Sequence, residues 1–190
     1  MNRPVVAILG PDVPDVPMLL DSPHSGHDYP ADFAPLAPMP RVRRAEDTAV
    51  DELFGEAPTA GIPLLKALFP RIVCDVNRAR ADIDPATIAG ELPFSPAPSA
   101  KAALGKGVIW MDAPPPPEPT ALYAALLPAV EVEARLARYW SPYRSALTAR
   151  LAAIRERHGR AIYIDCHSMQ SVSTAMHEEG AGIPRADIVL

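Results

Sequence analysis

Proline is the feature of this sequence that most restricts its fold. The chain has 24 prolines among 190 residues, more than twice the average usage. Proline lacks a backbone N–H and fixes φ, so it interrupts helices and central strands. Its distribution excludes a helical bundle over the whole length and requires long, stiff connections. The segment 79–119 is irregular and proline-rich, with proline at every position from 114 to 117, and we interpret it as a lid or a substrate-facing loop.

Size and charge narrow the class of protein. A chain of 190 residues that is 48% hydrophobic predicts one domain with a proper core. The net charge of −5 leaves no basic surplus, so we expect neither nucleic acid nor an anionic membrane as a partner. No apolar run is long enough to span a membrane, and the two cysteines, Cys74 and Cys166, suit a reducing compartment. We therefore expect a cytoplasmic protein; the sequence does not predict its oligomeric state.

Hydrophobic patterning predicts a small set of strands and helices. Apolar runs predict strands at 18–20, 71–76 and 161–166, and a further strand begins at 187–190. Apolar residues at three- and four-residue spacing predict a helix over 45–56 and a long helix or helix pair over 120–158. Pro128 and Pro142 must kink or divide the second of these, and Gly159 is a natural C-terminal cap. Strands alternating with helices predict an α/β fold with a mixed or parallel sheet covered on both faces.

Polar residues follow three of the predicted strands. In α/β folds chemistry gathers beyond the carboxyl ends of strands, and here His24, Asn77-Arg78 and His167 occupy such positions. Two imidazoles and a carboxylate, with one position left for water, form the usual catalytic zinc site. The alternative is that the histidines only cap the strand ends. His27 could join or replace His24.

The carboxylate of such a site must come from another segment. Residues 46–52 offer four candidates on one short predicted helix: Glu46, Asp47, Asp51 and Glu52. Most of these are expected to be solvated charges near a helix N-terminus. Asp47 and Asp51 lie one turn apart on the same side, so either could reach a metal.

The segment 75–78 predicts an anion site. The planar fork of Arg78 matches a carboxylate, and Asn77 adds an amide donor, so the pair suits an acidic substrate. The alternative is a structural ion pair between Arg78 and Asp75. Strand alternation puts Asp165 and His167 on one face and Cys166 on the other, so Cys166 is expected in the core rather than as a nucleophile.

Four segments in order (22–30, 46–54, 73–78 and 164–169) resemble the N-formylglutamate amidohydrolases, over about residues 18–190. That family is similar in turn to the zinc carboxypeptidases. The resemblance implies a three-layer α/β sandwich around a central mixed sheet, zinc-carboxypeptidase-like (phosphorylase/hydrolase-like), in a single domain over 1–190. It also implies one zinc per chain, although the same ligand types accept other divalent transition metals.

The resemblance also implies roles for individual residues. His24 and His167 would be metal ligands with Asp47 as the acidic one, while Asp51 and Glu46 stay open because carboxypeptidases place their acidic ligand where this chain has His27. Asn77 and Arg78 would bind the substrate carboxylate. The implied reaction is hydrolysis of N-formyl-L-glutamate, or a similar small N-acyl acidic amino acid, to formate and glutamate. The alternatives are a zinc carboxypeptidase, another amidase of this fold, or a non-catalytic metal- and carboxylate-binding remnant.

Three departures from the family pattern affect catalysis. Family members continue beyond the equivalent of Leu190, and the general-base glutamate lies in that part, so the chain is expected to lack the C-terminal portion of its domain. The family tends to have His where Tyr143 is followed by Arg144, and Arg where Trp110 is followed by Met111. We expect the last two changes to alter substrate handling.

Overall fold

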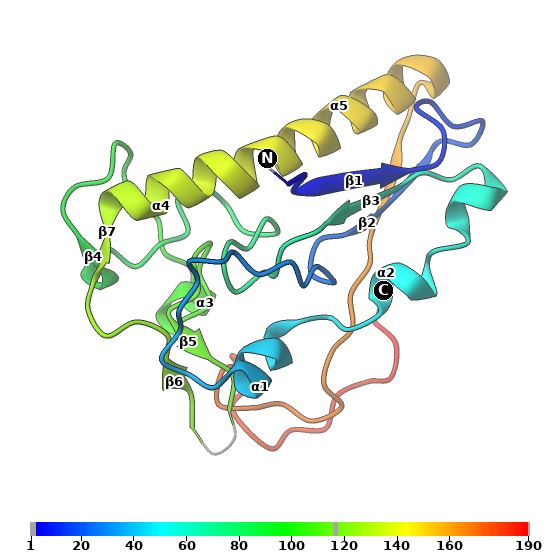
Figure 1. Cartoon of the computed structure of the whole chain (residues 1–190). Helices are drawn as coiled ribbons and strands as arrows, with labels where there is room; N and C mark the ends of the chain where they lie inside the picture. Colours follow the sequence, from blue (N-terminus) through cyan, green and yellow to red (C-terminus); the bar gives the residue numbers. More distant parts are fainter. Residues whose placement is uncertain (1–2, 116–117, 190) are drawn as a thin grey trace.

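A mixed sheet of four strands lies at the centre of the computed structural model, which describes residues 3–115 and 118–189 (Figure 1). Its strand order is β1-β3-β2-β8, where β1 pairs antiparallel with β3 and the other neighbours are parallel. These strands are β1 (Val6–Leu9), β2 (Met18–Ser22), β3 (Leu64–Ala67) and β8 (Ile162–Asp165). The expected α/β class with a mixed sheet is confirmed, as are the strands predicted at 18–20 and 161–166.

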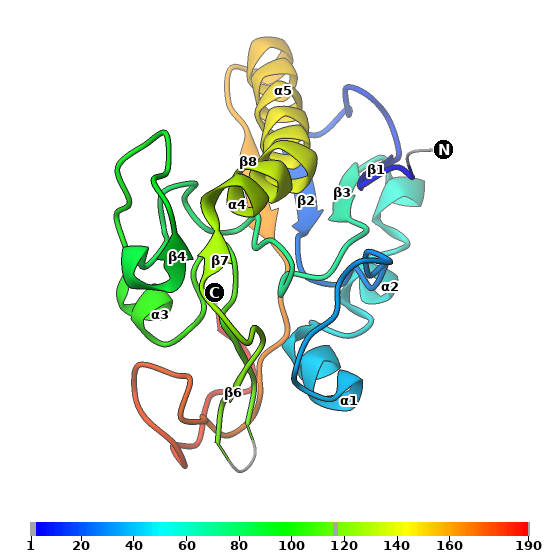
Figure 2. The ribbon, with the colours of Figure 1, turned by 60° about the vertical axis from the view of Figure 1, so that its left-hand side comes forward.

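The two faces of the sheet are packed differently. Leu19 of β2 faces the main core, which includes Leu147 and Ile154 of helix α5 (Ser141–His158). Leu20, the next residue, faces a second cluster with Leu64, Cys166 and Val50 of helix α2 (Val50–Leu53). Figure 2 shows α5 lying along one side of the sheet. The alternation of side chains along β2 therefore gives the sheet two apolar faces.

The long predicted helix begins later than expected. Helix α4 (Ala129–Arg135) starts after Pro128, a π-helical turn follows at Leu136–Trp140, and α5 continues to His158. Pro142 lies in the first turn of α5, where the wider π-helical turn comes directly before it, so the helix continues without a break. Gly159 ends α5 with a φ of 71°, as the sequence predicts. The residues before Pro128 instead form β6 (Thr120–Ala121) and β7 (Leu127–Pro128).

Three other sequence predictions of secondary structure are wrong. The segment 71–76 forms turns and irregular chain rather than a strand, and its apolar residues Ile72, Val73, Cys74 and Val76 are enclosed on all sides, which gives the same apolar run as a buried strand. The third strand of the sheet is β3 instead. The predicted helix 45–56 is reduced to a 3₁₀ turn at Arg43–Ala45 and to α2, because Ala49 takes a left-handed φ of 60°. No strand forms at 187–189, and Leu190 lies outside the described residues.

The remaining elements are short and lie mostly around the proline-rich segment. They are α1 (Met39–Val42), α3 (Ala100–Ala103), β4 (Ile88–Ala89), β5 (Asp112–Ala113) and 3₁₀ turns at Ala57–Ala60 and Pro85–Thr87. Lys101, Lys106 and Trp110 of the proline-rich segment line a cavity of about 780 Å³. Part of this segment therefore faces the site described below. In the described part of the chain, no helix has the length and apolar character needed to cross a membrane.

A buried carboxylate lies between the sheet and α5. Asp21 of β2 is only 1% exposed. It accepts hydrogen bonds from the hydroxyls of Tyr143 on α5 and Tyr163 on β8, the latter at 2.6 Å. Burial raises the pKa of Asp21 to about 7, although the hydrogen bond from Tyr163 opposes the shift. The protonated carboxyl is therefore favoured in the folded state.

Asp21→Asn is expected to stabilise the protein, and more so at higher pH. Because the folded pKa is raised, the stability that the protonated form contributes is present below pH 4 and is lost as the pH rises through about 7. The Asn variant does not ionise, so its gain in unfolding free energy should be about 2–3 kcal/mol larger at pH 8 than at pH 5. Urea denaturation with a chelator present measures this gain, with the exposed Asp28→Asn as control. An equal effect of Asp21→Asn at both pH values would contradict the interpretation.

Candidate metal centre

Two histidines meet beyond the ends of neighbouring parallel strands. His24 follows β2 and His167 follows β8, and the pairing of these strands brings the two residues to one edge of the sheet. Their Nδ1 atoms lie 3.1 Å apart. His24 is 2% exposed, whereas the side chain of His167 is 32% exposed. One imidazole is therefore buried and the other is accessible from a cavity.

Asp47 completes a triangle with the two imidazoles. Its Oδ2 lies 2.8 Å from Nδ1 of His167 and 3.5 Å from Nδ1 of His24. The backbone places it there, because the Asp47 N–H donates to the carbonyl of His24 at 3.0 Å and the Ser25 hydroxyl donates to the carbonyl of Asp47 at 3.1 Å. The acidic residue and the first histidine thus belong to two loops that are tied together.

Gly26 lets the His24 loop pack directly against another stretch of backbone. A Cβ at this position would lie 2.5 Å from the carbonyl oxygen of Phe69 and from the carbonyl carbon of Leu68. Any larger residue would therefore push the loop away from the chain that leads to Arg71 and Asp75.

The triangle has the dimensions of a divalent metal site. Its three edges measure 3.1, 2.8 and 3.5 Å, and tetrahedral coordination at about 2.0–2.1 Å requires edges of roughly 3.3 Å. These ligand atoms form a His/Asp/His group within 4.8 Å. Burial disfavours the charged form of His167, but hydrogen bonds to Asp165 and Asp47 outweigh this and raise its pKa to about 9. The site therefore favours a positive charge, which a cation can supply in place of the proton.

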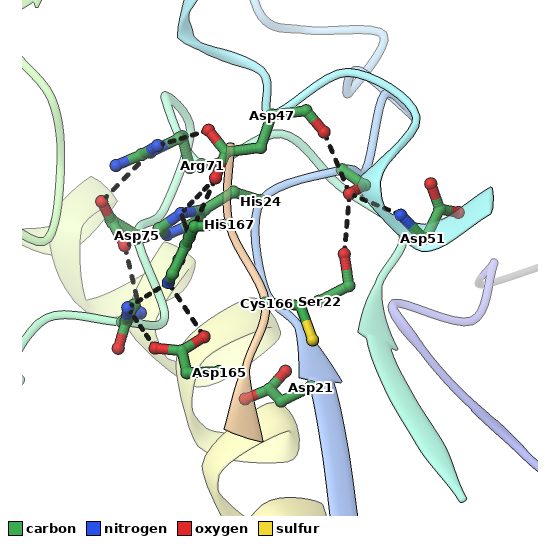
Figure 3. Close-up of polar contacts among 12 residues, drawn as sticks. Asp21, Ser22, His24, Asp47, Asp51, Arg71, Asp75, Asp165, Cys166 and His167 are labelled. Carbon is green, nitrogen blue, oxygen red and sulfur yellow. Dashed lines mark hydrogen bonds and ion pairs between the residues drawn. The ribbon is translucent and has the colours of Figure 1, made fainter. Parts of the chain in front are cut away.

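A second set of residues contacts those atoms of His24, His167 and Asp47 that point away from the centre of the triangle (Figure 3). Nε2 of His24 lies 2.8 Å from Oδ1 of Asp75, and Nε2 of His167 lies 2.9 Å from Oδ1 of Asp165. Nη1 of Arg71 donates to Oδ1 of Asp47 at 3.0 Å. Such outer partners fix the orientation of metal ligands. Here they leave both Nδ1 atoms and one carboxylate oxygen turned toward a common point.

Asp75 is the central residue of this second set and is fully buried. Besides His24, its carboxylate accepts from the indole N–H of Trp110 at 3.2 Å and from the backbone N–H of Asn77 at 3.0 Å. Its Oδ2 also lies 3.5 Å from Nε of Arg71. Burial alone would raise the pKa of Asp75, but the charges of His24 and Arg71 hold it well below its usual range. The carboxylate therefore stays ionised although it has no contact with solvent.

The other acidic and histidine candidates are engaged elsewhere. Glu46 accepts a hydrogen bond from the Tyr29 hydroxyl at 2.7 Å, and Asp51 pairs with Lys66 at 2.7 Å. Glu52 and His27 are exposed. Of these side chains and Asp47, the structure brings only Asp47 to the two histidines.

Cys166 lies in the core, as the alternation along its strand predicts. It is 4% exposed and belongs to the second apolar cluster. Burial raises the pKa of its thiol to about 11, so it stays protonated at neutral pH. This environment does not suit a nucleophile.

Asn77 and Arg78 both reach the site, although no strand precedes them. The amide of Asn77 donates to Oδ2 of Asp165 at 2.7 Å and lies 3.0 Å from Nε2 of His167. Nε of Arg78 is 3.8 Å from Oδ2 of Asp75, a long contact, and has no hydrogen-bond partner among the residues that the structure describes. The ion pair with Asp75 therefore leaves much of the Arg78 guanidinium available.

A cavity of about 780 Å³ opens over the triangle. Six cationic side chains line it: Arg44, Arg71, Arg78, Lys101, Lys106 and Arg185. Five carboxylates line it as well: Glu46, Asp47, Asp165, Glu178 and Glu179. Arg71 and Arg185 pair with two of these carboxylates. The lining is therefore mixed in charge, and Arg78, Lys101 and Lys106 are the cations in it that suit an anionic ligand.

Three residues of the site were not predicted from the sequence. They are Arg71, Lys106, and Trp110 in its role as a partner of Asp75. Arg71 and Asp75 bracket an apolar run, and charges that flank a buried run are a signal that could have marked a buried polar pair. Lys106 lies between two glycines, which marks a turn but not the direction of its side chain.

Comparisons with known proteins find relatives of this chain. A family model described as N-formylglutamate amidohydrolase matches residues 16–190. The crystal structure of the N-formylglutamate amidohydrolase from Ralstonia eutropha JMP134 superposes with a TM-score of 0.81 at 39% identity, covering 87% of this chain and 58% of that chain. This chain thus spans less than two thirds of that protein's length.

A second solved structure shares the fold at lower similarity. It is a gene product of Agrobacterium tumefaciens, with a TM-score of 0.56 and 18% identity, and the match covers 90% of this chain and 59% of that one. No curated protein sequence matches the chain.

Proposed function

This chain belongs to the N-formylglutamate amidohydrolase family, and on that premise we propose that it acts in the zinc-dependent hydrolysis of N-formyl-L-glutamate, or of a similar N-acyl acidic amino acid, to formate and glutamate. The observation that carries the proposal is the triangle of His24, Asp47 and His167 at the base of a cavity that Arg78, Lys101 and Lys106 also line. It unites a site for a divalent cation with a surface for an acidic ligand.

The proposed zinc ligands are Nδ1 of His24, Nδ1 of His167 and Oδ2 of Asp47. When bound, zinc supplies a Lewis acid that polarises the amide carbonyl and activates water for attack. Asp75 and Asp165 hold the imidazoles with Nδ1 turned inward, and Arg71 holds Asp47 in the same way. These three residues therefore act by orientation, before any substrate arrives.

We propose that Arg78, with Asn77 beside it, binds a substrate carboxylate. Arg78 lines the cavity, and its Nε has no hydrogen-bond partner among the described residues. A guanidinium binds a carboxylate through two parallel hydrogen bonds. The proton acceptor for the attacking water is expected, from the family resemblance, to be a glutamate outside residues 1–190, and this stays a prediction.

The proposed architecture is a single domain over 1–190 with zinc-carboxypeptidase-like layering. What supports it is the sheet itself, with α5 on one face and the apolar cluster of α2 on the other. Metal and fold do not distinguish an amidohydrolase from a carboxypeptidase, so substrates must do so.

Formate release is the direct test of this function. The purified chain is expected to contain one zinc by elemental analysis and to bind N-formyl-L-glutamate. Because the expected proton acceptor lies outside residues 1–190, formate release by this chain should be slow, and it should be lost in a chelator and recovered on adding zinc. His27→Ala, an exposed histidine outside the triangle, should keep both zinc and activity. Equal rates with and without chelator would exclude a metal mechanism. Cleavage of peptides but not of N-formyl-L-glutamate would indicate a carboxypeptidase, and ligand binding without cleavage a non-catalytic remnant.

A further inference from the structure

Lys106 has an unusual position for a lysine. It is only 9% exposed, yet it lines the large cavity together with Arg78 and Lys101. In the described part of the chain it has neither an ion pair with a carboxylate nor a side-chain hydrogen bond. Lysine is almost never buried unless it is paired. Its stem is buried, but its Nζ is not among the fully buried polar atoms that lack a partner, so the ammonium group opens onto the cavity, where a ligand can reach it.

The backbone around Lys106 is built to hold it there. Gly105 has a left-handed φ of 74°, and a Cβ at Gly105 would collide with the Asp112 side chain. A Cβ at Gly107 would collide with the carbonyl oxygen of Asp82. The segment is further fixed because the Val108 N–H donates to the Asp82 carbonyl at 2.8 Å and the Met111 N–H donates to the Gly105 carbonyl at 2.9 Å. This tight turn specifies where the lysine side chain begins.

The charges around Lys106 favour an anion beside it. Burial, followed by the charges of the nearby cations Arg71, Lys101 and Arg78, lowers the pKa of Lys106 to about 8, while Glu179 opposes the shift. The folded protein therefore holds several positive charges around one partly dehydrated space. The carboxylates of the cavity only partly offset these charges at Lys106, because its pKa is still lowered, so an anionic group beside Lys106 would be favourable.

We propose that Lys106 binds the second carboxylate of a dicarboxylic N-acyl amino acid, opposite the carboxylate held by Arg78, and so selects acidic over neutral substrates. This inference rests on the proposed function and adds to it a residue that determines specificity. Arg78 is joined to the metal site through Asp75, whereas Lys106 comes from the proline-rich segment. Two independent cations thus face one cavity, as a ligand with two carboxylates requires.

The test compares two ligands that differ only in this carboxylate. N-formyl-L-glutamate and N-formyl-L-glutamine have the same shape, but the second carries a neutral amide in place of the side-chain carboxylate. Selectivity is the ratio of their Kd values by calorimetry, or of kcat/KM where turnover occurs. The wild-type chain should prefer N-formyl-L-glutamate by about 10- to 100-fold. In Lys106→Met this ratio should fall to roughly 3 or less.

Lys66→Met is the matched control, because it removes the same charge from a lysine outside the cavity that pairs with Asp51. It should keep the wild-type ratio. Thermal unfolding checks that both variants are folded. Lys106→Gln, which is polar and neutral, should show the same loss of selectivity if Lys106→Met does not fold.

The outcomes separate this inference from the proposed function. A wild-type preference for N-formyl-L-glutamate that survives in both Lys106 variants overturns the role of Lys106 and leaves the function intact. If the wild type shows no preference, the proposed acidic substrate is wrong. The role of Lys106 is then tested by the binding of glutarate, a dicarboxylate without an amide. Weaker glutarate binding in Lys106→Met than in Lys66→Met supports the anion site, and equal binding overturns it.

Discussion

Asp47→Ala should abolish stoichiometric zinc binding, as should His24→Ala and His167→Ala. Each substitution leaves two protein ligands where a catalytic zinc site needs three. Loss of an outer partner already costs about 10- to 100-fold in metal affinity, so loss of a direct ligand should weaken zinc binding by more than about 100-fold. Elemental analysis after dialysis, followed by competition against a chelator of known affinity, measures the change.

Asp51→Ala is the matched control for this result. Asp51 is a carboxylate from the same segment, but it pairs with Lys66 rather than with the histidines. The variant should keep its zinc, with only the small loss of stability expected for a partly exposed ion pair. Zinc retained in Asp47→Ala but lost in Asp51→Ala would assign the acidic ligand to Asp51.

Asp75→Asn should affect both stability and metal affinity. The substitution keeps the shape of the side chain but removes a fully buried negative charge that faces His24 and Arg71. Removing one partner of a buried charge pair costs about 3–5 kcal/mol of unfolding free energy. The weaker acceptor for Nε2 of His24 should also lower zinc affinity by about 10- to 100-fold. Urea denaturation and chelator competition measure the two effects.

Asp165→Asn serves as the control, because Asp165 is the equivalent partner of His167 and its side chain is 25% exposed. Its loss should reduce zinc affinity to a similar degree but should affect stability much less, since solvent screens the change. The depressed pKa of Asp75 also predicts a pH dependence. The protein stability that its ionised carboxylate contributes is present above about pH 4 and is lost as the pH falls. Equal stability losses in the two variants would contradict the central role of Asp75.

The sequence could predict those elements whose hydrophobic pattern fits only one kind of secondary structure. The strands β2 and β8 were predictable as short apolar runs, and the helix that ends at Gly159 was predictable from apolar residues at three- and four-residue spacing and from its terminal glycine. The segment 71–76 was not, because burial on every side gives the same apolar run as a buried strand.

Some features of the metal centre could likewise be predicted from the sequence, and others could not. Pairing of β2 with β8 brings together two histidines that follow strand ends, and sequence can predict such a meeting. The identity of the acidic residue could not be predicted from helical spacing, because the left-handed Ala49 breaks the helix between Asp47 and Asp51. The importance of Asp75 depends on contacts with Trp110 and Arg71. Those contacts exist only in the folded chain.

The close packing of Gly26 against the backbone at Leu68 and Phe69 also limits how this site can diversify. The loop that carries His24 has no space to lengthen, swing or accept a side chain at its glycine without displacing the neighbouring chain. New substrate preferences would therefore have to arise from other residues that line the cavity, such as Lys101 and Arg185. Directed evolution or redesign of this protein should begin there and leave the loop after β2 unchanged.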